Sequence, residues 1–390
     1  MKGRAPLRRT PVPRNRVPFV LSLLALAAAS GLSFVLVAPN RLVSGTGTML
    51  ADLPGGAGWL LAAPWTVLAG SAFLRPSRAS RLAVACAAAL ALAMLAALAG
   101  AEAARQVDEL SPLARVSLGG GSWLLLLIAW LAAADALQGL GLGPVARLLV
   151  HGAVLLPLLG LLLHGDLDSL ALLKEYANRR EAFHDAWARH LAIVLATLAP
   201  ALLLGLPLGV VAARSERLAA IVFSVLNVIQ TVPSIALFGL LIGPLAWLGS
   251  RFPDSGIRGI GMLPAVIALT LYALLPIVHG AASGLRQVPS GVIDAARGMG
   301  MTKGQLFWRI EAPLAVPVLL SGLRVTAVQV VGLAVVAALV GAGGFGALVF
   351  QGLAGSALDL VVLGVLPVVA LALALDAALR ALAARLEARS

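Results

Sequence analysis

The stretch PSGVIDAARGMGMTKGQLFWRIEAP, residues 289–313, is a polar island between two hydrophobic runs that are each long enough to cross a membrane. Its first half predicts a short helix that begins at Ser290. Gly298 and Gly300 are expected to end this helix, because glycine is unfavourable inside helices and common just past their ends. A polar element of this kind between two spans is expected to contact something outside the bilayer.

The second half of the island predicts another short helix. Thr302 is followed three residues later by Gln305, which is the spacing of a capping box at a helix start. Leu306 and Ile310 are four residues apart and therefore share one face of that helix. Pro313 is expected to limit its length, because proline lacks the N–H that a helix interior needs. The island is therefore predicted to be a helix-turn-helix.

The composition indicates the class of protein. Of the 390 residues, 60% are hydrophobic and 12% are charged, and the mean hydropathy is +0.98. A soluble core cannot bury so much apolar surface, so the chain is predicted to be an all-α polytopic membrane protein. The net charge of +12 comes from basic residues scattered between apolar runs, which indicates membrane topology and argues against nucleic acid as a partner. Cys86 is the only cysteine, which excludes an internal disulfide.

About ten transmembrane helices are predicted from the apolar runs. They are residues 18–37, 59–74, 82–101, 122–140, 148–163, 190–213, 218–249, 262–279, 317–340 and 360–379. The seventh run is too long for one perpendicular crossing and too short for two crossings with a turn. Because Pro233 and Pro244 interrupt it, it is predicted to be one crossing by a broken helix with a short continuation outside the membrane. The sequence GAGGFG at residues 341–346 lacks the strand of a nucleotide-binding loop and predicts a tight external hairpin.

Three regions are predicted along the chain. Residues 1–165 form a five-span membrane region, and residues 166–189 form an external amphipathic linker helix on the bilayer surface. Residues 190–390 form a five-span core with a cytoplasmic loop at residues 280–316. Basic residues concentrate in the segments that this arrangement places in the cytoplasm, which predicts that both termini are cytoplasmic.

The polar island resembles a loop of one transporter family. Asp294-Ala295-Ala296, Gly300, Ile310 and Pro313 follow the E-A-A-x(3)-G-x(9)-I-x-L-P pattern of ATP-binding-cassette (ABC) importer permeases, with Asp294 in place of Glu and Ala312 in place of Leu. The resemblance implies a type I permease core and a loop that docks on an ATPase subunit. The residues that it assigns to ATPase coupling are Asp294, Ala295, Ala296, Gly298, Gly300, Ile310 and Pro313.

Four sequence blocks resemble the osmoprotectant branch of these permeases, which imports glycine betaine, choline and carnitine. They are NVIQTVPSIALFGLL (227–241), ALTLYALLPIVHG (268–280), DAARGMGMT (294–302) and ALVGAGGFGALVFQGL (338–353). The resemblance implies a subunit of the bacterial inner membrane that is not an enzyme and holds no cofactor. It further implies that partner ATPases hydrolyse ATP, that a binding protein delivers solute, and that a second permease, identical or related, completes the path within the surrounding lipid.

The first of these blocks predicts part of the translocation path. It places Gln230, Thr231 and Ser234 around the helix-breaking Pro233 at membrane depth, where polar groups are tolerated only against protein or water. Asn227, Gln230 and Ser234 also follow i, i+3, i+7 spacing, which puts them on one face of an undistorted helix. A kink used only for packing is the alternative.

Other functions stay open at this point. An ion-driven carrier is expected to show internal repeats and paired charges at midplane, and a membrane-embedded enzyme needs converging His, Asp, Ser or Cys side chains. Within the importer family, another small solute such as an amino acid is an alternative to glycine betaine. Asp135, Arg324 and Asp376 lie inside predicted spans, and the sequence assigns them no role.

Overall fold

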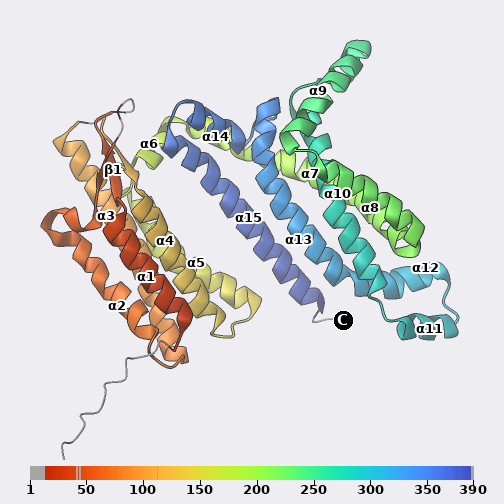
Figure 1. Cartoon of the computed structure of the whole chain (residues 1–390), viewed down its shortest axis with the longest axis horizontal. Coiled ribbons are helices and arrows are strands. Elements are labelled where there is room, and N and C mark those ends of the chain that lie inside the picture. The colour runs from red at the N-terminus through yellow and green to blue at the C-terminus, as the bar shows by residue number, and fades with distance from the viewer. Residues whose placement is uncertain (1–13, 41–42, 44, 112, 388–390) are drawn as a thin grey trace, which may run out of the picture. The chain divides into compact units, whose positions relative to one another are not determined.

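The computed structural model describes residues 14–40, 43, 45–111 and 113–387. The chain divides into two compact units, Met1–Ala177 (unit 1) and Asn178–Ser390 (unit 2) (Figure 1). The predicted linker helix at residues 166–189 is divided between the two units. It contains α6 (Ala171–Asn178) and the beginning of α7 (Arg180–Arg214). Residues 180–189 are therefore the first turns of a long helix and not a separate surface helix. The boundaries of the three predicted regions stay predictions.

Unit 1 is a helical bundle with a small sheet at one end. Its helices are α1 (Arg16–Gly31), η1 (Leu50–Asp52), η2 (Pro54–Leu61), α2 (Ala62–Ser71), α3 (Arg78–Glu109), α4 (Gly120–Gln138), α5 (Pro144–His164) and α6. Helix α3 packs against α2, α4 and α5. Ala91, Ala99, Ala129 and Ala133 are almost completely buried between them. Such small residues let helices approach closely where the surrounding lipid gives no hydrophobic driving force.

The structure corrects two of the predicted spans. Strands β1 (Val35–Ala38), β2 (Thr46–Thr48) and β3 (Arg115–Leu118) pair antiparallel in the order β2-β1-β3. The first predicted span, 18–37, therefore ends as a helix at Gly31, because β1 pairs with a strand distant in sequence. The second, 59–74, begins inside the 3₁₀-helix η2, so its α-helical part is only the ten residues of α2.

An ion pair and a hydrogen bond hold the sheet end of unit 1 together. Arg115 of β3 contacts the buried carboxylate of Glu175 at 2.5 Å, and Lys174 donates to the carbonyl of Ala114 at 3.1 Å. Burial, with a smaller contribution from the nearby Arg115, lowers the pKa of Lys174. These contacts fasten α6 to the strand that precedes α4, so α6 is part of unit 1.

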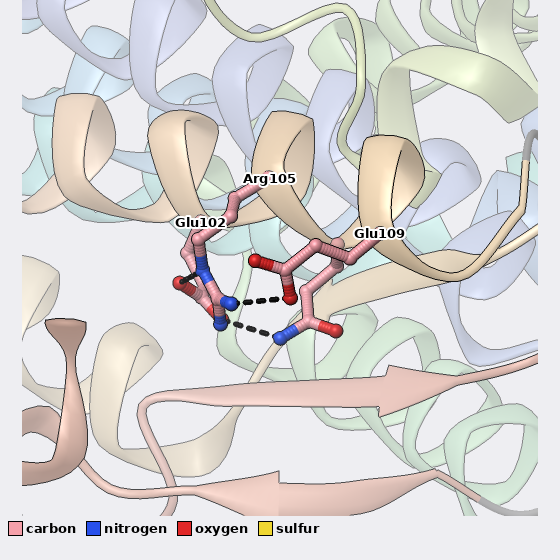
Figure 2. A network of polar contacts seen from close by, with 4 residues as sticks. Glu102, Arg105 and Glu109 are labelled. Atoms are coloured by element: carbon pink, nitrogen blue, oxygen red, sulfur yellow. Dashed lines mark hydrogen bonds and ion pairs between the residues drawn. The ribbon is translucent and has the colours of Figure 1, made fainter.

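A second polar network lies at the C-terminal end of α3 (Figure 2). Glu102 is 4% exposed and accepts hydrogen bonds from Arg105 at 2.6 and 3.0 Å and from Gln106 at 2.8 Å. Arg105 also contacts the exposed Glu109 at 2.5 Å. All four residues are on one face of one helix, so the network is local and stabilises the end of α3.

Unit 2 is built around α10. Its helices are α7, α8 (Glu216–Thr231), α9 (Ser234–Arg251), η3 (Pro253–Ser255), α10 (Met262–Arg286), α11 (Ser290–Gly298), α12 (Lys303–Leu306), the π-helical turn η4 (Phe307–Glu311), α13 (Ala312–Val336), η5 (Ala337–Val340), α14 (Phe345–Ala354) and α15 (Leu358–Glu387). Helix α10 packs against α7 and α13. A Cβ added at Gly280 of α10 would lie 3.2 Å from the Cα of Gly322 of α13, so the two glycines let these helices approach closely at this crossing.

Seven helices within the described residues are long and apolar enough to cross a membrane. They are Arg78–Glu109, Gly120–Gln138, Arg180–Arg214, Ser234–Arg251, Met262–Arg286, Lys303–Val340 and Leu358–Leu386. Shorter apolar helices include Arg16–Gly31 and Leu149–His164. The all-α polytopic fold is therefore confirmed, and the count of ten spans stays a prediction.

The predicted tight hairpin at residues 341–346 is wrong. Gly341, Gly343 and Gly344 have positive φ and turn the chain, but α14 follows from Phe345 before α15 begins. Phe345 is completely buried, with its ring 5.4 Å from that of Trp187 of α7. The connection is a turn followed by a packed helix, because an aromatic residue directly after the glycines fastens α14 to α7.

Candidate functional site

The polar island forms a helix-turn-helix that we call the coupling element, residues 290–313. Helix α11 ends at Gly298, and Gly300 follows with φ of 81°, a conformation that favours glycine. The predicted capping box is confirmed: the backbone N–H of Gln305 donates to the side chain of Thr302 at 3.3 Å, and that of Thr302 donates to Gln305 at 2.9 Å. Ser290 is the first helical residue but gives no side-chain cap.

The seven residues assigned to coupling lie on both helices of this element and at its junction with α13. Ala296 is buried, whereas Asp294 and Ala295 are exposed on α11. Ile310 is half-buried in η4, and Pro313 is exposed in the first turn of α13. Asp294 contacts Arg297 one turn later at 3.4 Å, in a weak exposed pair. The structure thus presents a carboxylate on an outward face.

Pro313 does not end the second helix, contrary to the prediction. The chain remains helical from Lys303 to Val340, and the turn η4 immediately before the proline is π-helical. Proline normally clashes with the carbonyl four residues earlier, and a wider π-helical turn shifts the hydrogen-bond register there. The coupling element therefore continues without a loop into the transmembrane helix α13.

A partly buried ion pair holds this continuous helix to α7. Both carboxylate oxygens of Glu311, which is 2% exposed, accept hydrogen bonds from the guanidinium of Arg214, the last residue of α7; the Nη1–Oε1 distance is 2.8 Å. Arg286 of α10 donates to the carbonyl of Ala212 at 2.6 Å and so satisfies an end carbonyl of α7. The end of α7 is held by α10 on one side and by the coupling element on the other.

The coupling element also exposes large apolar side chains. Trp308 is 74% exposed and Met299 is 71% exposed, and Val292 adds a smaller exposed surface. Tryptophan carries a large share of the binding energy in many protein interfaces. Trp308, Met299, Arg214 and Glu311 were not predicted from the sequence. The adjacent aromatic residues Phe307 and Trp308 in a polar stretch could have indicated Trp308. The ion pair between Arg214 and Glu311 could not be predicted in this way, because it joins residues 97 positions apart.

The second predicted site is the break between α8 and α9. Val232 is extended, with φ of −71° and ψ of 126°, as expected for a residue before proline. Tyr272 of α10 donates its hydroxyl to the carbonyl of Val232, and Gln230 donates to the carbonyl of Tyr272 at 2.8 Å. The predicted break at Pro233 is confirmed, whereas Pro244 lies inside the continuous helix α9.

The break changes the predicted face of path residues. The i, i+3, i+7 spacing assumed a continuous helix, but Gln230 and Ser234 lie on opposite sides of the break. Asn227 and Thr231 are exposed on α8, while Gln230 is turned onto α10. The structure brings Gln230 and Tyr272 together and does not gather all five predicted residues, so their role in a path stays a prediction.

The charged residues inside the predicted spans of unit 2 are paired. Arg324 of α13 contacts Asp376 of α15 at 2.8 Å, and Asp376 also contacts Arg380 one turn later. A paired carboxylate is far less costly in an apolar environment than an isolated one. These residues therefore join α13 to α15.

Comparison with known proteins follows the division into two units. Residues 205–388 match the family described as binding-protein-dependent transport system inner membrane component, and residues 14–173 match the N-terminal domain of the ABC transporter permease YehY. The osmoprotectant import permease protein OsmW of Salmonella typhimurium is 40% identical over 188 residues, which cover 48% of this chain and 84% of that protein. The chain belongs to the ABC importer permeases.

Other relatives of this permease carry related descriptions. The carnitine transport permease protein OpuCB of Listeria monocytogenes is 39% identical over 51% of this chain and 85% of its own. The choline transport system permease protein OpuBB of Bacillus subtilis is 33% identical over 48% and 80%. The permease is thus an inner-membrane transport subunit rather than an enzyme, as predicted.

Proposed function

We propose that this permease is the membrane-spanning subunit of an ATP-driven importer for osmoprotectants such as glycine betaine. A binding protein delivers the solute from outside, and two permease chains enclose one path that opens alternately to each side. The relatives named for osmoprotectants, carnitine and choline support this class of solute. The second chain is either another copy or a related permease.

The coupling element is the observation that carries the proposal. It combines an exposed carboxylate at Asp294 with the exposed apolar side chain of Trp308, as a docking surface for another protein requires. It also continues without interruption into α13 and is ion-paired to α7. A movement imposed by an ATPase subunit is thereby transmitted to two transmembrane helices.

The broken helix supplies the part that moves. The carbonyl freed at Val232 is satisfied by Tyr272 of α10, and the α8 side of the break is fastened through Gln230. Since α10 also packs against α7 and α13, a shift of those helices reaches the break directly. The predicted path residues Asn227, Gln230, Thr231, Pro233 and Ser234 surround it.

The test is ATP-dependent uptake by the permease reconstituted with its ATPase and binding protein in vesicles. Asp294→Lys is expected to abolish uptake of glycine betaine and co-purification of the ATPase. Asp254→Lys, an equally exposed reversal in η3, is the matched control for co-purification. If Asp294→Lys and a deletion of residues 294–300 both retain the ATPase and ATP-dependent uptake, the proposal is wrong.

The same vesicles separate the alternatives. Uptake of an amino acid in place of glycine betaine, choline and carnitine assigns a different solute to the same machinery. Uptake that an uncoupler abolishes and ATP depletion leaves intact identifies an ion-driven carrier.

A further inference from the structure

Unit 1 contains a polar pocket of about 460 Å³ at one end of its bundle. It lies where α1 and α3 begin and where α2 and α4 end, and its lining includes Arg14, Asn15, Arg81 and Asp135. The ends of transmembrane helices lie at the level of lipid headgroups. The pocket is therefore at the depth at which a phospholipid carries its charges.

The charges in the pocket are arranged for an external ligand. Among the described residues, neither Arg14 nor Arg81 has an ion-pair partner, and Asp135 interacts with Arg81 electrostatically without forming a close pair. A side chain at Gly139 would collide with the guanidinium of Arg81, so glycine at this position leaves room for the arginine at the pocket wall. Two guanidinium groups and one carboxylate thus face the same space.

An apolar cavity of about 520 Å³ lies along α1 and α2, which also line the polar pocket. It is lined by Leu23 and Leu26 of α1 and by Trp65 of α2, and it begins at Phe19 and Phe73. Phe19 directly follows Pro18, which lines the polar pocket, so the two spaces lie at neighbouring levels of α1. A charged pocket at a helix end beside an apolar cavity matches the head and the tail of one lipid.

We propose that unit 1 binds one phospholipid with a primary-amine headgroup, whose phosphate lies between Arg14 and Arg81, whose ammonium contacts Asp135 and whose acyl chain enters the apolar cavity. Basic pockets at the ends of transmembrane helices are known binding places for phosphate headgroups. An ammonium donates hydrogen bonds to a carboxylate, and a trimethylated headgroup has no such donors. The buried indole N–H of Trp65, which has no partner among the described residues, is satisfied by an ester carbonyl of the lipid.

The test is native mass spectrometry of the full chain titrated separately with phosphatidylethanolamine, phosphatidylglycerol and phosphatidylcholine. The wild type is expected to retain one phosphatidylethanolamine about 10-fold more tightly than phosphatidylcholine, as one charged hydrogen bond allows. Arg14→Gln with Arg81→Gln is expected to lower the retention of all three lipids, because the two guanidinium groups are proposed to contact the phosphate that these lipids share. Arg75→Gln with Arg78→Gln, at exposed arginines of the same region outside the pocket lining, is the matched control.

Two further measurements separate the parts of the proposal. Asp135→Asn is expected to abolish the preference for phosphatidylethanolamine over phosphatidylcholine while phosphate-dependent retention persists. Soluble glycerophosphoethanolamine is expected not to displace the lipid, and equal displacement would show that the site takes a free zwitterion instead.

Equal retention of all three lipids, or retention unchanged in the double arginine variant with an unchanged melting temperature, overturns the proposal. If the double variant does not fold, Arg14→Gln alone, at an exposed side chain, gives the same decision. None of these measurements depends on the ATPase, so failure here leaves the proposed transport function untouched.

Discussion

In unit 1 the buried carboxylates are paired inside one compact body, whereas in unit 2 Glu311 is paired across the junction between α7 and the coupling element. Glu102 bonds to residues on its own helix, and Glu175 of α6 bonds to the strand before α4. Unit 2 also exposes Trp308 next to its pair. Pairing of a buried carboxylate with an arginine therefore stabilises the folded structure of unit 1. In unit 2 such a pair joins the proposed docking surface to transmembrane helices.

Removing the cation of the unit 2 pair is expected to have the largest effect. Arg214→Ala leaves the carboxylate of Glu311 buried and unpaired, which destabilises the permease by about 2–4 kcal/mol, somewhat less than for a fully buried pair because Arg214 is half-exposed. Thermal unfolding of the purified permease measures this loss. Arg214→Met with Glu311→Met is expected to recover stability but not uptake, with ATPase activity no longer linked to solute. Full uptake in that double variant would show that the ion pair stabilises the structure but does not take part in transport.

Truncating the exposed tryptophan tests the surface beside that pair. Trp308→Ala is expected to weaken binding of the ATPase by about 2 kcal/mol, roughly 30-fold, because exposed tryptophans act as anchors in protein interfaces. The affinity of the permease for the isolated ATPase measures it. Trp247→Ala, at a similarly exposed tryptophan of α9, is the control and is expected to leave this affinity unchanged. Equal weakening by both variants would contradict a docking role for the coupling element.

A substitution in the Glu102 network tests the buried carboxylate of unit 1, as Arg214→Ala tests that of unit 2. Glu102→Gln is expected to destabilise the permease by about 1–2 kcal/mol, because two of its neighbours lose a charged acceptor. Glu109→Gln, in the same network but more than half exposed, is expected to change stability by less than about 0.5 kcal/mol. Neither is expected to change uptake per folded molecule. A fall in that specific uptake with Glu102→Gln would show that unit 1 takes part in transport.

The smallest effect is expected at the broken helix. Tyr272→Phe removes the hydroxyl that satisfies the carbonyl of Val232 and is expected to reduce stability by about 1 kcal/mol. Thermal unfolding measures this loss, and the rate of ATP-dependent uptake is expected to fall if the break takes part in transport. Tyr176→Phe, in unit 1, is the matched removal of a hydroxyl away from the break. An uptake rate that is unchanged by Tyr272→Phe would favour a kink used only for packing.

The sequence predicted those parts of the fold that depend on local chemistry. The capping box at Thr302, the turn at Gly300 and the break at Pro233 each follow from the preferences of one or two residues, and the structure has all three. The all-α membrane class followed from composition. The roles of the seven coupling residues and of the five path residues remain predictions.

The features that the sequence did not reveal depend on distant partners or on a cooperative change in the helix. Val37 pairs with Val116 across two strands, and Arg214 forms an ion pair with Glu311. No local sequence pattern predicts either contact. The effect of Pro313 was misjudged because a π-helical turn accommodates it, and α14 was missed because its stability comes from packing of Phe345 on α7. Hydrophobic runs likewise overestimated the first two spans, since apolar residues also occur in the strand β1 and in the 3₁₀-helix η2.

The side of the membrane on which the coupling element lies decides whether an ATPase in the cytoplasm can bind it. In a Cys86→Ala background, Lys303→Cys places a single thiol on the exposed start of α12, and Ser255→Cys places one on the predicted outer face in η3. A membrane-impermeant maleimide applied to intact cells is expected to label Ser255→Cys and not Lys303→Cys, and inverted membrane vesicles are expected to reverse this. Labelling of Lys303→Cys from the outside would place the element away from cellular ATP and contradict the account.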